Sequence, residues 1–258
     1  MVDTSRLSGK KPLKALTFGF KRAVGRNSFG RITTRHKGGG AKRLFRVIDF
    51  KYDKKNVPAV VETVEYDPNR TSFIALVRYA DGERRYVLAA EDMNPGTSFM
   101  VSEQAPASPG NRLPLSAIPV GTFVFNVELV PGQGAQLVRS AGGAAQVAAV
   151  EGEHAQLKLP SGEIRMVRSN CWATVGALSN AEWSFMTIGK AGRNRLRGIR
   201  PTVRGSAMNP RDHPYGGGEG RQLRGTKRPK TKWGKVTGGV KTRKKKKSDK
   251  FILQRRKK

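Results

Sequence analysis

The middle of the chain alternates apolar and polar residues in short runs, a pattern typical of half-buried β-strands. Turn residues such as Asp67-Pro68-Asn69, Asp81-Gly82 and Ser161-Gly162 separate the runs. Glycine accepts the positive φ that tight hairpin turns require, so Asp81-Gly82 in particular predicts a hairpin. The pattern predicts strands over residues 57–66, 72–79, 84–89, 122–129, 135–139, 144–150, 155–159 and 163–167.

The proline-rich span 104–119 is the best candidate for a boundary within this strand-rich body. Short strands at regular spacing, with turn residues between them, indicate small closed barrels or sandwiches. We therefore predict an all-β fold class with one barrel over 42–104 and a second over 105–185. Barrels this small are marginally stable alone, so we expect them to pack together or against a partner.

The two ends of the chain differ from the body, and we predict basic extensions over 1–41 and 186–258. From Gly189 onward strand periodicity is lost, and the arginines between 193 and 204 follow no single face. Near the end, Lys244 to Lys247 form an unbroken run. Such segments bury too little apolar surface to offset their ordering entropy. We therefore expect the C-terminal extension to be disordered in the free protein, with nothing internal to fold it.

Charge follows the same division of the chain. The 258 residues include 50 Lys and Arg against 19 Asp and Glu, a net charge of +31. Residues 1–51 carry net +12, residues 52–189 net −3, and residues 190–258 net +22. The whole excess therefore lies in the two ends, and a polyanionic partner is the natural explanation for it.

Several other classes of function find little support in the sequence. No apolar run approaches the roughly 18 to 20 residues that span a bilayer, so we expect no membrane partner. The single cysteine, Cys171, rules out an internal disulfide and a four-cysteine zinc site, and we interpret it as a small core residue. The three histidines are far apart without ligand spacing, so we expect no metal and no cofactor.

The stretch GRITTRHKGGGAKR, residues 30–43, favours nucleic-acid contact. A phosphate loop of the Walker type needs a hydroxyl after its lysine, but Arg43 follows Lys42 here, which argues against nucleotide hydrolysis. Guanidinium groups and hydroxyls suit phosphate and 2′-hydroxyl recognition, and glycines permit close approach of the backbone. The candidate RNA-binding residues in this stretch are Arg31, Thr33, Arg35, His36, Lys37, Gly39, Lys42 and Arg43.

The stretch NPRDHPYGGGEGR, residues 209–221, offers either a catalytic Asp212-His213 pair or a shaped piece of backbone. An aspartate adjacent in sequence is poorly placed to orient a histidine, and no nucleophile is specified nearby. Pro210 and Pro214 fix φ, whereas the glycines 216–218 permit conformations closed to other residues. We interpret the stretch as a docking loop whose glycines mark the closest approach of the chain to RNA.

Six motifs together closely resemble the universal ribosomal large-subunit protein two family, in its bacterial-type form. They are the stretch 30–43 above, YDPNR (66–70), DGERRY (81–86), GKAG (189–192), RGIRPTVRGSAMNP (197–210) and DHPYGGGEGR (212–221). The resemblance implies an OB-fold barrel, then an SH3-like barrel, with both extensions buried in large-subunit rRNA. It implies a non-enzymatic primary rRNA binder near the peptidyl-transferase centre that supports subunit association and tRNA binding.

The implied partners are large-subunit rRNA, neighbouring ribosomal proteins and the small subunit, with the chain a monomer within a cytoplasmic or organellar ribosome. His213 corresponds to a family histidine once proposed as catalytic. The sequence departs from the family in lacking a Pro-Thr-Ser-Pro-Gly-Arg-Arg-like element near its start. It also has Tyr215 where a second histidine is common and Arg211 where a small apolar residue is common, and these two suit base stacking and phosphate contact. The further candidate RNA-binding residues are Arg197, Arg200, Arg204, Asn209, Arg211, Asp212, His213, Tyr215, Gly216, Gly217, Gly218, Arg221, Lys244 and Lys245.

Two other readings of the sequence stay open at this point. One is a free nucleic-acid chaperone or architectural protein, which would also carry a large positive charge. The other is a His213-dependent acyl-transfer catalyst, in which His213 would move protons during peptide-bond formation. The segregated charge and the family motifs favour the ribosomal reading over both.

Overall fold

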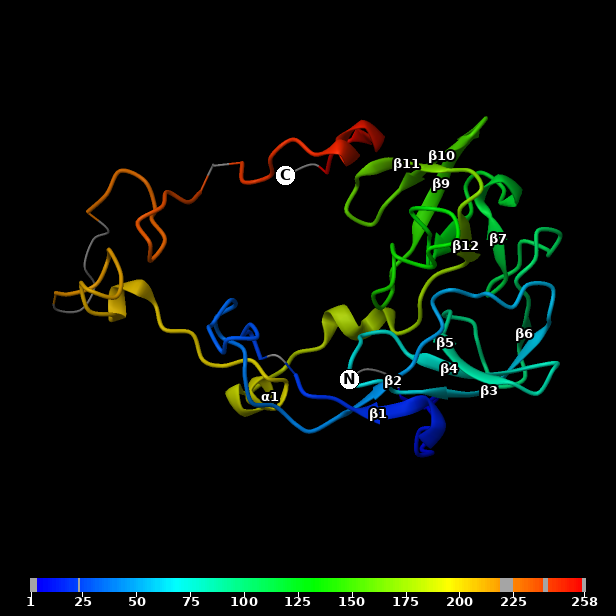
Figure 1. The fold of residues 1–258 in the computed structure, drawn as a ribbon, viewed down its shortest axis with the longest axis horizontal. Coiled ribbons are helices and arrows are strands. Elements are labelled where there is room, and N and C mark those ends of the chain that lie inside the picture. The colour runs from blue at the N-terminus through cyan, green and yellow to red at the C-terminus, as the bar shows by residue number, and fades with distance from the viewer. Residues whose placement is uncertain (1–3, 23, 219–224, 239–240, 257–258) are drawn as a thin grey trace. The chain divides into compact units, whose positions relative to one another are not determined.

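The computed structural model describes residues 4–22, 24–218, 225–238 and 241–256 (Figure 1). Its regular structure is almost entirely β, and α1 (Ala191–Leu196) is the only α-helix among these described residues. The predicted all-β fold class is therefore confirmed. The chain forms two compact units: unit 1 comprises Met1–Lys21, Arg43–Thr187 and Ser248–Lys258, and unit 2 comprises Arg22–Lys42 and Ile188–Lys247.

The first part of unit 1 contains a four-stranded antiparallel sheet in the order β5-β4-β3-β6. The predicted Asp81-Gly82 hairpin is confirmed: Gly82 has φ +86° and its N–H donates to the Tyr79 carbonyl at 2.9 Å. A two-stranded ribbon, β1-β2, precedes the sheet along the chain. The elements are η1 (Lys14–Leu16), β1 (Thr17–Gly19), β2 (Leu44–Arg46), β3 (Ala59–Glu65), β4 (Ile74–Tyr79), β5 (Arg84–Leu88) and β6 (Ser98–Phe99).

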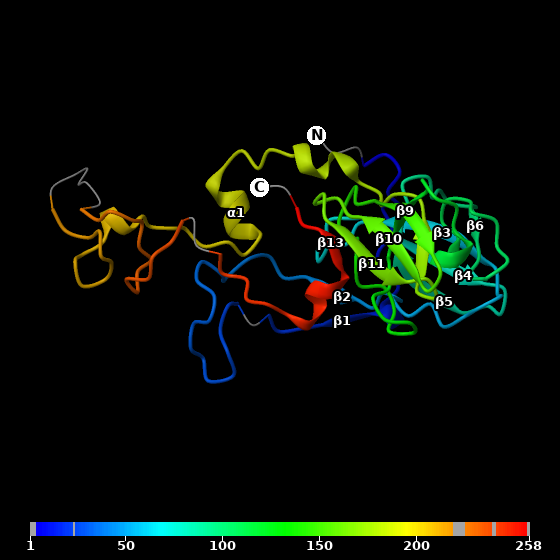
Figure 2. The ribbon, with the colours of Figure 1, turned by 90° about the horizontal axis from the view of Figure 1, so that it is seen from above.

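The second part of unit 1 contains a seven-stranded antiparallel sheet in the order β13-β11-β10-β9-β8-β12-β7. Figure 2 shows β9, β10 and β11 side by side as neighbouring strands of this sheet. The elements are β7 (Arg112–Pro114), η2 (Leu115–Ala117), β8 (Phe123–Phe125), β9 (Ala145–Glu151), β10 (His154–Lys158), β11 (Ile164–Arg168), β12 (Trp172–Val175), η3 (Ala181–Phe185), η5 (Lys247–Phe251) and β13 (Ile252–Gln254), with η4 (Gly205–Ala207) in unit 2.

Two predicted strands differ from the structure for a local backbone reason. The strand predicted over 122–129 stops at Phe125, because Asn126 adopts φ +50° and leaves the extended conformation. The segment 135–139 is not a strand, because Val138 has φ +54° and the Ala135 N–H donates to the Phe50 carbonyl at 2.7 Å. An isolated antiparallel bridge between Val127 and Leu137 connects the two segments.

The last described residues return to the body of unit 1 as β13. In this edge strand, Gln254 pairs with Ile164 and Ile252 pairs with Arg165 of β11. The expectation that nothing internal folds the C-terminal extension is therefore wrong for residues 252–254. The apolar run Phe251-Ile252-Leu253 interrupts the basic tail and supplies the side chains that an edge strand needs.

Two clusters of buried apolar side chains form the core of unit 1. The first includes Ile74, Tyr79 and Tyr86, and the second includes Leu115 and Leu157. Cys171 is fully buried in the second cluster, as predicted for a small core residue, and burial raises the pKa of its thiol to about 11. Phe125, Trp172 and Leu178 belong to the second half of the body but pack into the first cluster. The domain boundaries at 41, 104 and 185 stay predictions.

A buried ion pair joins the strands of the second sheet to the first core cluster. Arg112 is 1% exposed, and its Nη2 donates to Glu128 Oε1 at 3.1 Å while its Nη1 donates to the Asn126 carbonyl at 2.7 Å. Its guanidinium carbon lies 4.5 Å from the centre of the Tyr52 ring. Burial lowers the pKa of Arg112 and raises the pKa of Tyr52 to about 12. This network holds the interior of unit 1 together.

Candidate RNA-binding surface

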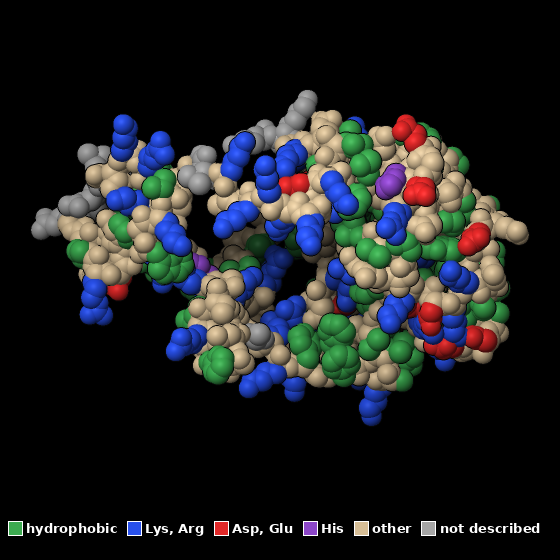
Figure 3. Space-filling view, turned by 45° about the horizontal axis from the view of Figure 1, so that its top comes forward, with side chains coloured by type: hydrophobic (Ala, Val, Ile, Leu, Met, Phe, Trp, Pro, Cys, Tyr) green, Lys and Arg blue, Asp and Glu red, His purple; other side chains and the backbone are tan. Residues whose placement is uncertain are grey.

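Unit 2 carries most of the positive charge of the chain. Its residues include 26 Lys and Arg against two Asp and Glu, a net charge of +24 out of the total of +31. Figure 3 shows Lys and Arg side chains spread over this unit, whereas most of the Asp and Glu side chains in view gather on unit 1. A surface of this composition is the electrostatic footprint of a nucleic-acid-binding protein.

The N-terminal part of unit 2 is a tight hairpin. Arg26 bridges Ile32 across it, and the Asn27 side-chain oxygen accepts hydrogen bonds from the N–H groups of Phe29 at 3.1 Å and Arg31 at 2.9 Å. At its base, the Thr34 N–H donates to the Gly25 carbonyl at 3.1 Å. Backbone hydrogen bonds and the Asn27 side chain thus fix the shape of the hairpin, and this shape fixes the positions from which its basic side chains project.

The hairpin continues into a segment that pairs with the chain just after α1. Lys37 bridges Ile199, and the Arg200 N–H donates to the His36 carbonyl at 3.1 Å. Gly40 has φ +92°, and a Cβ there would lie 2.9 Å from the Gly198 nitrogen. This glycine therefore serves the packing of unit 2 against itself. Gly39, which has φ +62° and no atom within 4 Å of its Cβ position, is the open one of the triplet.

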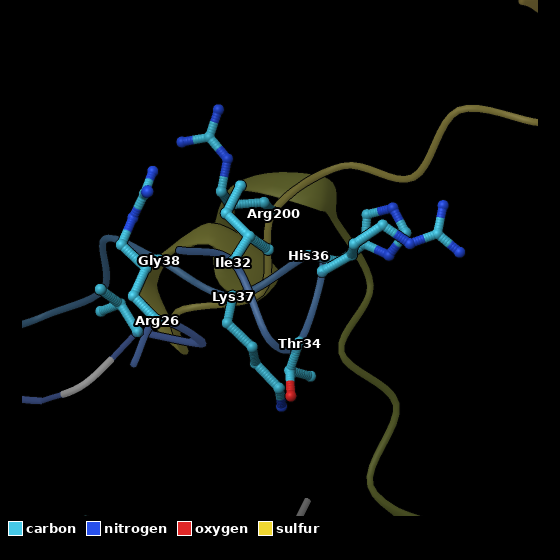
Figure 4. Close-up of a pocket in the computed structure, with 9 residues that line it drawn as sticks. Arg26, Ile32, Thr34, His36, Lys37, Gly38 and Arg200 are labelled. Atoms are coloured by element: carbon cyan, nitrogen blue, oxygen red, sulfur yellow. The ribbon is translucent and has the colours of Figure 1, made fainter. Parts of the chain in front are cut away.

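These paired segments enclose a pocket of about 590 Å³. Figure 4 shows the guanidinium groups of Arg26 and Arg200 extending to the same side, with Lys37 extending to the opposite side. Among the described residues, the lining includes four cationic side chains and no carboxylate. Guanidinium groups bind phosphate oxygens in a bidentate fashion, and the apolar lining suits a sugar or a base edge. The lining residues are Val24, Arg26, Ile32, Thr34, Arg35, His36, Lys37, Gly38 and Arg200.

Four of the predicted site residues meet in this pocket although they come from both ends of the sequence: Arg35, His36, Lys37 and Arg200. Arg31 and Thr33 lie on the same hairpin, and the Gly39 carbonyl accepts a hydrogen bond from Arg22 at 2.6 Å. Lys42 is exposed at the end of this segment. Arg43 belongs to unit 1, where its Nη1 donates to the Pro68 carbonyl, so the structure does not gather it with the others.

The sequence interpretation missed Arg22, Arg26 and Trp233 as members of this surface. The Arg35 guanidinium carbon lies 5.4 Å from the centre of the Trp233 ring, and the Lys232 ammonium lies 5.0 Å from it. Trp233 is 66% exposed. An aromatic residue inside the basic run KTKWGK, residues 230–235, was the available signal, because interleaved cations and aromatic rings are typical of RNA-binding surfaces.

The glycine-rich stretch that follows Met208 closes on its own backbone. The Asn209 carbonyl accepts hydrogen bonds from the N–H of Asp212 at 2.9 Å and of His213 at 3.2 Å, and the Gly217 N–H donates to the Met208 carbonyl at 2.9 Å. A Cβ on Gly216 would lie 2.2 Å from the Asn209 oxygen. A Cβ on Gly217 would lie 2.7 Å from Pro210 Cγ. The packing of the loop therefore accounts for these glycines without an RNA contact.

His213 is held by the same loop. Its Nδ1 accepts a hydrogen bond from the Tyr215 N–H at 3.1 Å, and its ring covers Gly205, where a Cβ would lie 2.5 Å from the imidazole. The Tyr215 ring lies 5.1 Å from the imidazole centre. The Tyr215 hydroxyl accepts a hydrogen bond from the Lys230 N–H. Tyr215 thus braces the loop internally, and the group that orients His213 is a backbone N–H.

The remaining predicted residues lie on unit 2 outside the pocket. Arg197 ends α1, Arg204 precedes η4, and Arg211 projects from the closed loop. Lys244 and Lys245 are exposed, Gly218 adopts φ +81°, and Arg221 falls outside the described residues. Among the described residues, no group of three His, Cys, Asp or Glu could hold a metal ion, and no helix has the length and apolarity needed to cross a membrane.

Comparison with known proteins gives a consistent result along the chain. Residues 13–101 match the RNA binding N-terminal domain of Ribosomal Proteins L2, and residues 108–234 match the C-terminal domain of the same proteins. The large ribosomal subunit protein uL2 of Cereibacter sphaeroides is 55% identical over 256 residues, which cover 99% of this chain and 91% of the relative. With both domains matched and identity along nearly its whole length, the chain belongs to the L2 family of ribosomal proteins.

Proposed function

We propose that this chain is a structural constituent of the large ribosomal subunit and binds rRNA through unit 2. The observation that carries the proposal is the pocket in which Arg26, Arg35, Lys37 and Arg200 meet without a carboxylate, inside a unit of net charge +24. Such a cluster repels itself unless phosphates neutralise it, and neutralisation releases the counterions that make RNA binding favourable. The match to the RNA binding N-terminal domain includes residues 22–42 of unit 2, which carry Arg26, Arg35 and Lys37.

The finer roles follow from membership of the family. The chain organises rRNA near the peptidyl-transferase centre and supports subunit association and tRNA binding. Its partners are large-subunit rRNA, neighbouring ribosomal proteins and the small subunit, and it acts as a monomer within the ribosome of a bacterial cytoplasm or an organelle. The closed loop of residues 208–217 supports an organising role, because a loop fixed by its own hydrogen bonds presents Arg211 and Asp212 to RNA in one arrangement.

Sedimentation tests the proposal directly. Cell extract is separated on a sucrose gradient at physiological salt, and the chain is quantified in each fraction by mass spectrometry. We expect one copy per large subunit and little free chain. A chain found mostly outside the large-subunit fractions would contradict the proposal and would favour the free nucleic-acid chaperone.

His213 acts in this proposal as a structural residue. A general acid or base needs a free ring nitrogen at the reacting group and an orienting partner for the other nitrogen. Here Nδ1 accepts the Tyr215 N–H, so the neutral ring carries its proton on Nε2 and has no lone pair left to act as a general base, and the imidazole covers Gly205 of η4. The same contacts explain why a histidine stands at this position without invoking proton transfer.

A further inference from the structure

Phe29 is the most exposed large apolar side chain that the structure describes. It lies at the tip of the N-terminal hairpin of unit 2 and is 87% exposed. Burying an aromatic ring is favourable, so a ring that stays exposed to water makes the free chain less stable than it would be with the ring covered. A single exposed apolar residue needs no explanation by itself, so the backbone that carries Phe29 has to be considered next.

The backbone around Phe29 is fixed on both sides. The Gly30 N–H donates to the Asn27 carbonyl at 3.0 Å, which closes a four-residue turn with Phe29 at its third position. The Phe29 N–H itself donates to the Asn27 side-chain oxygen at 3.1 Å. Arg26 Nη1 donates to the Gly30 carbonyl at 2.8 Å and so braces the far side of the turn. The ring therefore projects from a pre-organised turn, and little backbone entropy remains to be lost when a partner covers it.

The charges around the ring identify the chemistry of the partner. Arg26 and Arg31 stand immediately before and after the turn that carries Phe29, and the cationic pocket begins on the same hairpin. An apolar protein surface would have to accept these cations unpaired. An unpaired nucleotide can both cover the ring and neutralise the cations, because its base stacks on the ring while its flanking phosphates pair with the arginines.

We propose that Phe29 is a stacking platform for one unpaired base of large-subunit rRNA, with Arg26 and Arg31 placed for the phosphates beside that base. The proposal deepens the rRNA-binding function and rests on it. It assigns to the hairpin a contact through a π face, which is independent of the ionic contacts in the pocket.

The test uses the full-length chain and deproteinised large-subunit rRNA, with binding measured over a series of salt concentrations. Replacing Phe29 with Ala or Leu should lower the association constant by about 5- to 150-fold, the usual range for one stacked base. Phe29→Tyr and Phe29→Trp should stay within about threefold of the parent, because both keep a π face. Since stacking releases no counterions, the slope of log K against log salt should not change. Arg31→Gln should instead reduce that slope by up to about one.

The matched control is Phe185→Ala, because Phe185 is 84% exposed but lies on unit 1. Equal losses at positions 29 and 185 would overturn the proposal in favour of nonspecific apolar contact. If Phe29→Ala bound rRNA as tightly as the parent, the ring would make no contact and the proposal would fail. If Phe29→Leu bound as tightly as the parent, apolar contact without stacking would suffice and the proposal would also fail. If Phe29→Ala binds RNA normally but is lost from assembled subunits, the ring contacts a protein and the proposal fails. Failure of the parent chain to bind rRNA would instead refute the proposed function.

Discussion

Replacing the buried Arg112 with Met provides the sharpest test of how unit 1 is stabilised. Methionine keeps a long unbranched side chain but removes the guanidinium group, so the Glu128 carboxylate loses its cation at 3.1 Å and the Asn126 carbonyl loses its donor at 2.7 Å. The Glu128 side chain is only 3% exposed and cannot recover these contacts from water. Breaking a buried pair on one side typically costs about 3 to 5 kcal/mol. We expect that loss in the free energy of unfolding.

Neutralising the Glu128 carboxylate that Arg112→Met leaves unpaired should restore part of the lost stability. In the double variant Arg112→Met with Glu128→Gln, a neutral amide replaces the carboxylate. The amide oxygen can still accept the hydrogen bond that the Trp172 backbone N–H donates to Glu128 at 3.3 Å. Because replacing both members of a buried ion pair is often close to neutral, the double variant should recover about 2 kcal/mol or more relative to Arg112→Met.

Urea unfolding of the full-length chain, followed by tryptophan fluorescence, measures both effects. The control is Arg78→Met: Arg78 is 58% exposed in its side chain and pairs with Glu62 at 3.4 Å, so its replacement should cost no more than about 1 kcal/mol. The reasoning is refuted if Arg112→Met costs as little as Arg78→Met, or if the double variant is as unstable as Arg112→Met alone.

Three further predictions concern the closed loop and the buried tyrosine. His213→Gln should keep peptidyl transfer by assembled subunits within about tenfold, since losing a proton-transfer group costs about 10² to 10⁴; a larger fall in particles of normal composition contradicts this. Gly216→Ala should reduce incorporation of the chain into large subunits, measured by mass spectrometry, because its Cβ would lie 2.2 Å from the Asn209 oxygen. Gly192→Ala, whose Cβ would have no atom within 4 Å, should not reduce it. Equal incorporation of the two variants refutes the packing argument. Burial raises the pKa of Tyr52 to about 12, so its hydroxyl loses its proton at lower pH in the unfolded chain than in the folded one, and the free energy of unfolding should fall between about pH 10 and 12. Urea titrations at several pH values should show a smaller fall for Tyr52→Phe. An unchanged pH dependence in that variant would contradict this assignment.

Local patterns in the sequence predicted β3, β4 and β5 of one sheet and β8 to β11 of the other, but not β1, β2, β6, β7, β12 or β13. The Asp81-Gly82 turn fixed the β4–β5 hairpin, and alternation located β3, β9, β10 and β11 within a few residues. The errors arose where tertiary contacts decide the backbone. Asn126 leaves the extended conformation with φ +50°, and its carbonyl accepts a hydrogen bond from Arg112. No local sequence pattern predicts this contact. The apolar residues of β13 stood in a strongly basic tail, and the charge masked their strand signal.

The candidate site was predicted in its composition but not in its geometry. Basic residues and glycines marked both segments of unit 2, yet nothing in either segment shows that Lys37 pairs with Ile199 across more than 160 positions. The glycines at 216 and 217 were interpreted as room for RNA, whereas Asn209 and Pro210 occupy the space beside them. A sequence shows that a Cβ is absent, but only the folded chain shows which atoms fill its place.

The central claim, that the cations of unit 2 bind rRNA, is tested most directly by the salt dependence of binding. Full-length chains with four cations replaced by Gln are compared for binding to deproteinised large-subunit rRNA, and circular dichroism checks that each is folded. Because each phosphate contact contributes about 0.7 to 0.9 to the slope of log K against log salt, the unit 2 variant should lose about 3 to 4 from that slope. The control variant on unit 1 should keep the parent slope, and equal slopes for both variants would contradict the account. The unit 2 variant carries changes at Arg26, Arg35, Lys37 and Arg200, and the control at Arg78, Arg84, Lys158 and Arg168.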